Sequence, residues 1–138
     1  NGGALVTMSY YGADKVVGNY NLMGPVKAAL EASVRYLAKE LGERGIRVSV
    51  VCPQYIATAI TGLDEKLPAD APAGLLSVEQ AATAIVDGLE REPFLILTHP
   101  EVLTYAQRKT ADYDRWIGGM RRLRAGLRNG EGFLKVRK

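Results

Sequence analysis

The chain has 138 residues, of which 47% are hydrophobic and 24% are charged, and its formal net charge is +3. These values fall in the range of soluble globular proteins and suffice for one ordinary domain. No run of eighteen apolar residues and no signal-peptide pattern occurs, so we expect a cytoplasmic protein without a membrane span. The single cysteine, Cys52, lies in an apolar stretch and cannot form an internal disulfide.

The charge is unevenly distributed along the chain. After Pro100 there are ten Lys and Arg against four Asp and Glu, which gives +6, whereas the preceding part has eight against eleven, which gives −3. Clustered positive charge attracts anions, so the basic C-terminal segment is compatible with an acidic partner such as a nucleic acid, an anionic lipid or an acidic protein. A basic surface that is simply solvated remains the simplest interpretation.

The first half of the chain predicts a strand followed by a helix. Residues 4–9 (ALVTMS) form a short apolar run before an aromatic, glycine-containing stretch, which predicts a buried strand that ends in a functional loop. Over about residues 21–41, apolar residues recur at helical spacing. Pro25 is tolerated only near a helix start, so we expect the regular helix to begin within a few residues of Gly24. The apolar face comprises Leu30, Val34, Leu37 and Leu41.

The alternation of strand and helix continues beyond this helix. Residues 46–53 (IRVSVVCP) predict a strand that is covered on both faces of a parallel sheet. Residues 54–76 contain prolines and glycines and show no sustained hydrophobic periodicity. The segment is too long for an ordinary connection, which predicts a functional lid rather than a simple turn. Ser77 and Gln80 resemble a capping box that opens the next helix.

The C-terminal part adds one strand and one helical segment. Residues 94–99 (FLILTH) predict another buried strand. Residues 101–123 are helical in composition, and we expect Gly118-Gly119 to weaken or bend this helix. The end of the chain is expected to be loosely ordered.

Three strands and three helices in alternation predict an α/β fold. We expect the C-terminal half of a Rossmann-like, doubly wound parallel sheet with flanking helices and right-handed crossovers. Residues 1–125 would form this part of the domain, and residues 126–138 a basic, loosely ordered tail. The glycine-rich loop that opens such folds is missing from the sequence, because Gly2-Gly3 precedes a strand rather than a helix. We therefore expect the N-terminal half of the fold to be absent.

A tyrosine and a lysine near the start of the first helix carry the functional signal. Tyr20, Lys27, the helix ending LAKEL, the strand GIRVSVVCP and Thr58 follow one another in an order that resembles the short-chain dehydrogenase/reductase family. This resemblance implies that Tyr20 is the catalytic acid and that Lys27 tunes the tyrosine and hydrogen-bonds the nicotinamide ribose. A nearby ammonium group favours the phenolate form of a tyrosine. Tyr11 and Lys15 form a competing pair, but only Lys27 lies early in the long helix, so we favour Tyr20 and Lys27.

Residues 1–45 resemble the enoyl-acyl-carrier-protein reductase branch of that family. The spacing YxxxxxxK and the preceding SYYGADKVVGNYNLMG carry this resemblance, in which a second tyrosine, here Tyr10, lies ten residues before the catalytic one. It implies hydride transfer from reduced NAD or NADP to the β-carbon of a trans-2-enoyl thioester in fatty-acid synthesis. Tyr20 would stabilise the developing enolate, and Tyr10 would line the acyl pocket. Acyl carrier protein is then a candidate partner, and a homo-oligomer is expected of the complete protein.

Residues 46–138 resemble other short-chain dehydrogenases instead. The segment PQYIAT resembles the general Pro-Gly-x-x-x-Thr pattern rather than the Gly-Pro-Ile-x-Thr of the enoyl reductases, with Gln54 in place of the glycine. The resemblance implies cofactor contacts by Pro53, Ile56 and Thr58. A ketoreductase or alcohol dehydrogenase that acts on a small carbonyl substrate therefore stays open as an alternative.

Other polar residues favour structural roles. His99 stands at a strand end, which indicates a surface or hydrogen-bonded histidine, and without a second histidine we expect no metal site. Asp112 and Asp114 are two residues apart on a helix and do not face the same way, so they do not predict an acid/base pair. An alternative from another class is a non-catalytic protein that binds nucleic acid or membrane through RWIGGMRRLRAGLR. It lacks a long basic face interleaved with aromatic residues, which counts against it.

Overall fold

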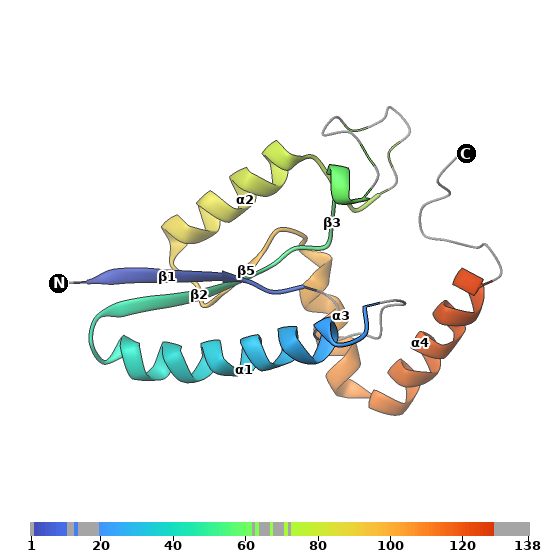
Figure 1. Cartoon of the computed structure of the whole chain (residues 1–138), viewed down its shortest axis with the longest axis horizontal. Helices are drawn as coiled ribbons and strands as arrows, with labels where there is room; N and C mark the ends of the chain where they lie inside the picture. The colour runs from blue at the N-terminus through green and yellow to red at the C-terminus, as the bar shows by residue number, and fades with distance from the viewer. Residues whose placement is uncertain are drawn as a thin grey trace. The chain divides into compact units, whose positions relative to one another are not determined.

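The computed structural model of the chain describes residues 2–10, 13, 20–61, 63, 67, 71 and 73–128. It divides into two compact units, Asn1–Pro100 and Glu101–Lys138. The first unit contains every described strand, and the described part of the second consists of two helices (Figure 1).

A three-stranded parallel sheet forms the centre of the first unit. Its strands lie in the order β1 (Gly3–Met8), β2 (Ile46–Cys52) and β5 (Leu95–Leu97). The strands expected within residues 4–9, 46–53 and 94–99 are therefore confirmed, together with the α/β fold and the parallel sheet. β2 lies in the middle and is buried from Val48 to Val51, as its continuous apolar sequence predicts.

β1 differs from β2 in burial although both strands are apolar. The prediction that β1 is a buried strand is wrong for the described structure, because Leu5, Val6 and Met8 are each about half exposed. The reason is its position, since β1 lies at the sheet edge and pairs with β2 alone. On the side of β1 away from β2, no described strand pairs with its backbone N–H and C=O groups, as is typical of an edge strand.

Helix α1 (Met23–Gly42) follows β1 and packs on β2. It begins one residue before Gly24, and Pro25 is its third residue, as the proline argument predicts. Val34 is buried and packs in one cluster with Val48 and Val50 of β2. The predicted apolar face is confirmed except at Leu37, which is exposed. The partly buried members of this cluster are Leu30, Ala38, Leu41 and Cys52.

Helix α2 (Val78–Arg91) connects β2 to β5 and begins with the predicted capping box. The Ser77 hydroxyl oxygen accepts the Gln80 N–H at 3.1 Å, and the Gln80 Oε1 accepts the Ser77 N–H at 2.9 Å. Gly88 is buried where α2 meets β5. A Cβ at this position would lie 2.5 Å from the Ile96 Cγ2, so the glycine lets the helix approach the strand closely.

The two helices lie on opposite faces of the sheet, α1 below the strands and α2 above them in Figure 1. Both connections, from β1 to β2 and from β2 to β5, step in the same direction across a parallel sheet. Helices on opposite faces therefore give the two crossovers opposite hands. The expectation that every crossover is right-handed is wrong for one of the two.

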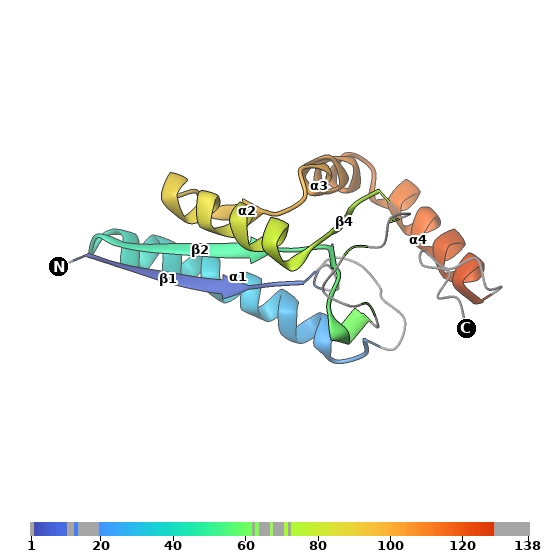
Figure 2. The same cartoon turned by 90° about the horizontal axis from the view of Figure 1, so that it is seen from above.

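The segment between β2 and α2 is only partly described. β3 (Tyr55–Ile56) pairs in parallel with β4 (Leu75–Leu76), and a 3₁₀ turn spans Ala59–Thr61. Figure 2 shows β4 leading into the start of α2. Most residues from 62 to 72 lie outside the described residues, so the predicted lid stays a prediction.

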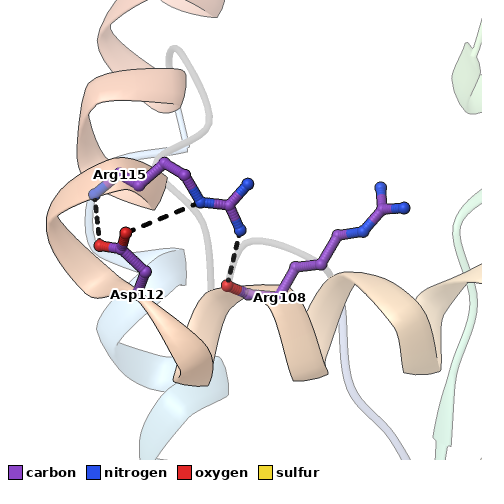
Figure 3. A network of polar contacts seen from close by, with 3 residues as sticks. All are labelled: Arg108, Asp112 and Arg115. Carbon is purple, nitrogen blue, oxygen red and sulfur yellow. Dashed lines mark hydrogen bonds and ion pairs between the residues drawn. The ribbon is translucent and has the colours of Figure 1, made fainter.

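Over residues 101–128, the second unit contains α3 (Glu101–Ala111) and α4 (Tyr113–Arg128). The helix break falls at Asp112, which the sequence did not predict, and Gly118-Gly119, where a weaker or bent helix was expected, lie inside the continuous helix α4. Figure 3 shows the cause, because the Asp112 Oδ1 accepts the Arg115 N–H at 2.9 Å and so caps the start of α4. The Arg115 Nε lies 3.8 Å from the Asp112 Oδ2, and its Nη2 lies 3.4 Å from the Arg108 carbonyl oxygen.

An aromatic cluster stabilises the first turn of α4. Tyr113 and Trp116 meet edge to face, with ring centroids 6.2 Å apart, and the Lys109 Nζ lies 4.9 Å from the centroid of the Trp116 ring. The helix runs to Arg128, and residues 129–138 of the predicted tail lie outside the described part of the chain. Among the residues that the structure describes, no helix is long and apolar enough to cross a membrane.

Candidate functional site

The candidate site lies at the carboxyl edge of the parallel sheet. Because all three strands run in one direction, the residues that follow them gather at this edge: Ser9 and Tyr10 after β1, Pro53 and Gln54 after β2, and Thr98 and His99 after β5. The Ser9 N–H donates to the Val51 carbonyl oxygen at 2.8 Å and joins the first two strand ends. Ligands of open α/β sheets bind outside the carboxyl ends of the strands.

Two side chains of α1 hold the end of β1. The Lys27 Nζ donates to the Met8 carbonyl oxygen at 2.9 Å. The Ser9 hydroxyl, on a residue that is 2% exposed, donates to the Glu31 carboxylate. Lys27 and Glu31 are four residues apart and therefore share one helix face. Sequence reasoning missed Ser9 and Glu31, although the spacing of Glu31 from Lys27 is a signal that points to this face.

Tyr10 and Tyr20 lie together beside this strand end. Their ring centroids are 5.0 Å apart and the rings are inclined at 50°. Burial raises the pKa of Tyr10, and the neighbouring phenols of Tyr55 and Tyr20 raise it further. The raised pKa favours the neutral phenol form of Tyr10. Tyr55 is a further member of the group that sequence reasoning did not single out as a site residue.

The structure brings some of the expected catalytic residues together and not others. Tyr10 contacts Tyr20, and Lys27 is bound to the residue two before Tyr10. No direct hydrogen bond joins the described side chains of Tyr20 and Lys27. The competing residues Tyr11 and Lys15 lie outside the described residues, so the choice between the two pairs rests on the sequence.

The expected cofactor segment after β2 is held by a threonine hydroxyl. The Thr61 Oγ1 accepts the Thr58 N–H at 3.1 Å and lies 2.7 Å from the Thr58 carbonyl oxygen and 3.1 Å from that of Ile56. The Ala57 N–H donates to the Leu76 carbonyl oxygen at 2.9 Å. These bonds fix the backbone of Ile56 and Thr58. Thr61 was not expected from the sequence.

His99 is buried, with 1% of its surface exposed, and hydrogen-bonded, which confirms the structural interpretation. Its Nδ1 accepts the Gln54 N–H at 3.3 Å and lies 2.7 Å from the Thr98 Oγ1. Since Nδ1 is an acceptor, Nε2 carries the proton and donates to the Gly74 carbonyl oxygen at 3.1 Å. His99 thus ties the end of β5 to the residues after β2 and before β4.

Other polar groups do not extend the site. Within the described part of the chain, no three His, Cys, Asp or Glu side chains gather in a group that could hold a metal ion. Asp112, considered above for acid/base chemistry, instead caps α4.

A parallel sheet with a tyrosine pair and a helix-borne lysine at its carboxyl edge agrees with the expected class of short-chain dehydrogenases/reductases, which are oxidoreductases. The family model described as enoyl-(acyl carrier protein) reductase matches residues 1–82, more than half of the chain. The chain therefore belongs to the enoyl-(acyl carrier protein) reductase family of this class.

Curated relatives agree over a shorter stretch. The enoyl-[acyl-carrier-protein] reductase [NADH] FabI of Rickettsia prowazekii is 59% identical over 58 residues, which are 42% of this chain and 22% of that enzyme. The enoyl-[acyl-carrier-protein] reductase [NADH] 1 of Rhizobium meliloti is 54% identical over 66 residues, 47% of this chain and 24% of that enzyme. The match thus spans about a quarter or less of the length of these relatives.

Solved structures confirm the fold over a larger part of the chain. The crystal structure of FabI from Candidatus Liberibacter asiaticus superposes with a TM-score of 0.55 at 27% identity, over 71% of this chain and 43% of that one. A short-chain dehydrogenase from Sphingobium yanoikuyae, solved in complex with NADPH, has a TM-score of 0.58 at 20% identity, over 98% of this chain and 47% of that one. The second likeness shows the fold alone.

Proposed function

We propose that the chain carries the catalytic residues of an NAD(P)H-dependent enoyl-thioester reductase that acts in fatty-acid synthesis. The observation that carries this proposal is the pairing of Tyr10 with Tyr20, at 5.0 Å between ring centroids, beside a strand end held by Lys27. Family membership and the identity to the Rickettsia enzyme support it.

The described residues fit a nicotinamide cofactor at the carboxyl edge. The Lys27 ammonium group uses one N–H on the Met8 carbonyl and keeps two for ribose hydroxyls. The Gln54 Nε2 is buried without a hydrogen-bond partner, so the edge has an unused donor. Lys27, Pro53, Ile56 and Thr58 would hold the cofactor, which as NADH or NADPH supplies a hydride when bound.

Tyr20 acts on the substrate oxygen. As hydride reaches the β-carbon of a trans-2-enoyl thioester, the electron pair of the C=C bond moves toward the thioester carbonyl and charge develops on its oxygen. The Tyr20 phenol donates a hydrogen bond to this oxygen and stabilises the enolate. A proton taken up at the α-carbon completes the saturated thioester. Lys27 keeps positive charge beside the site and holds the backbone of Met8, two residues before Tyr10.

Tyr10 orients the acyl chain rather than supplying a charge. Its raised pKa keeps the phenol neutral, and its ring contacts that of Tyr20. An aromatic wall next to the catalytic phenol leaves the thioester oxygen to Tyr20 and packs against the apolar chain. Ser9 and Glu31 are positioning residues because their hydrogen bond holds the chain directly before Tyr10.

Acyl carrier protein is the proposed carrier of the thioester, in a cytoplasmic setting. The exposed Arg121 and Arg122 of α4 offer it positive charge. We also propose that the complete protein is a homo-oligomer, in which exposed apolar residues of α1 such as Val26 and Tyr36 are covered by a second copy.

A ketoreductase or alcohol dehydrogenase is the second candidate. The observation that favours it is the segment PQYIAT, which has the general family pattern rather than that of the enoyl reductases, while the family match ends at residue 82. In this candidate the same Tyr20 would donate a proton to the oxygen of a ketone.

One assay separates these candidates. The chain is joined to the N-terminal part of the Rickettsia prowazekii reductase to give a full-length protein, called here the joined protein, and NADH and NADPH oxidation are followed with crotonyl and acetoacetyl thioesters. We expect turnover of the crotonyl thioester and its loss in the Tyr20→Phe variant. Reduction of only the acetoacetyl thioester would establish the second candidate, and turnover of neither, in a folded protein that binds NADH, would reject both.

A further inference from the structure

The side-chain amide of Gln54 is an unsatisfied hydrogen-bonding group at the carboxyl edge. Its Nε2 is buried and has no hydrogen-bond partner. Buried donors are almost always paired, because a donor that has lost water and gained no acceptor destabilises the fold. Such a group in a native structure calls for a specific explanation, and an acceptor supplied by a ligand is one.

The backbone of Gln54 is fixed from outside its own segment. Its N–H donates to the Nδ1 of His99, 45 residues later in the chain, and His99 is itself held by Thr98 and by the Gly74 carbonyl. With 1% of its surface exposed, His99 has little freedom to move. The base of the Gln54 side chain is therefore set by three segments that meet at the edge.

Gln54 also stands where the general family pattern has a glycine. Among the described residues other than glycine, only Asn21 and Glu92 have positive φ, so the turn after β2 does not require glycine. The glutamine is accommodated without backbone strain. It adds an amide to a place where the family pattern has no side chain, directly before the expected cofactor contacts Ile56 and Thr58.

We propose that Gln54 is a ligand-binding residue whose Nε2–H donates a hydrogen bond to a carbonyl oxygen of the molecule bound at the carboxyl edge. This inference rests on the proposed function and names the chemistry that the edge recognises. Two sources supply such an oxygen, the carboxamide of the nicotinamide ring and the carbonyl of the thioester or ketone substrate. Both supply an acceptor for a buried donor whose backbone is held by His99.

The test uses the joined protein labelled with ¹⁵N, in which the side-chain NH₂ signals report each glutamine directly. The Gln54 signals are assigned by their loss in Gln54→Met, which keeps the length of the side chain but removes the amide. Gln80, whose amide is engaged in the α2 capping box, and the exposed Gln107 are the internal controls. The probes are NADH, reduced nicotinamide mononucleotide, which has the carboxamide without the adenine half, and the crotonyl thioester of N-acetylcysteamine.

We expect the nicotinamide compounds to shift the Gln54 NH₂ signals, to leave those of Gln80 and Gln107 in place, and to slow solvent exchange at Gln54. The dissociation constant should rise about tenfold in Gln54→Met, as for the loss of one buried hydrogen bond. A shift with the thioester alone supports the proposal with the substrate as the source of the oxygen.

Two results would overturn the proposal, and they differ in what else they reject. If backbone signals of Met8 and Leu22 shift while Gln54 does not, a ligand binds at the edge without this amide, and the proposed function survives. If no signal shifts with any probe at millimolar concentration, the edge binds none of these ligands, and the proposed function of this chain fails together with the inference.

Discussion

The two halves of the site are held in different ways. The end of β1 is held by charged side chains of the helix that follows it, Lys27 on the Met8 carbonyl and Glu31 on Ser9. The end of β2 is held by neutral groups from distant segments, above all His99. The first half offers the phenols and the ammonium group that the proposed chemistry needs. The second offers backbone and amide groups suited to orienting a ligand.

This difference separates effects on catalysis from effects on folding. Changes in the first half should alter turnover while the fold persists, since Lys27 and Glu31 are only partly buried. Changes in the second half should mainly lower the free energy of unfolding, because buried polar groups there lose their hydrogen-bond partners.

The largest expected effect is that of Tyr20→Phe in the joined protein. Removal of the phenolic hydroxyl takes away the group proposed to stabilise the enolate, so kcat should fall by about 10²- to 10⁴-fold. Tyr113→Phe is the matched control because Tyr113 is 51% exposed on α4 and lies outside the proposed site and subunit interface. Equal turnover in the Tyr20 variant and the wild type would remove Tyr20 from the chemistry.

In the second half, His99→Leu should lower the free energy of unfolding by about 2 to 3 kcal/mol, because the Gln54 N–H and the Gly74 carbonyl both lose their partner. His99→Asn keeps an acceptor near the position of Nδ1 and should recover about half of this loss. Urea denaturation of the 138-residue chain, monitored by circular dichroism, measures both variants. Equal losses would show that the side-chain volume matters rather than the hydrogen bonds.

A smaller effect is expected on α4. Arg121→Glu combined with Arg122→Glu should raise KM for a carrier-protein thioester by about three- to tenfold and leave KM for the N-acetylcysteamine thioester unchanged. The increase should shrink as salt is raised, because exposed charges are screened. Equal changes in KM for both thioesters would contradict docking through this helix.

The smallest effect concerns the pKa of Tyr10, which is raised above its ordinary value near 10. Stabilisation by the neutral phenol is fully present below pH 10 and is lost as the pH rises through the folded-state pKa of Tyr10. Absorbance titration of the phenolates should show a late component that disappears in Tyr10→Phe. Tyr55→Phe should shift this component to lower pH, because a neighbouring phenolate raises the pKa of Tyr10. Persistence of the late component in Tyr10→Phe would refute the assignment.

The sequence predicts what depends on local pattern. The three sheet strands, the start of α1 near Gly24 and the Ser77 capping box all follow from spacing or from residue preference, and all are confirmed. The break at Asp112 is not predicted from the sequence, because it depends on a side-chain cap, whereas α4 continues through Gly118-Gly119 despite the low helix propensity of two glycines.

The site contacts were harder to predict because they join distant positions. Ser9 and Glu31 are 22 residues apart, and Gln54 and His99 are 45 apart. A local sequence pattern does not predict which of these distant residues form hydrogen bonds with each other. The burial of β1 was overestimated for a related reason. An apolar strand sequence indicates that the strand can be buried in a sheet covered on both faces. Whether the strand lies at the sheet edge depends on the tertiary fold.

The central claim is that the edge carrying Tyr10, Tyr20 and Lys27 directs hydride to the β-carbon of an enoyl thioester. The most direct measurement gives the joined protein NADH deuterated at the transferring position, with crotonyl and acetoacetyl thioesters in separate reactions, and locates the deuterium by NMR. We predict one deuterium at the β-carbon of a butyryl thioester formed from the crotonyl substrate. Deuterium found only at the carbinol carbon of a 3-hydroxybutyryl thioester, with the crotonyl thioester unchanged, would contradict the claim.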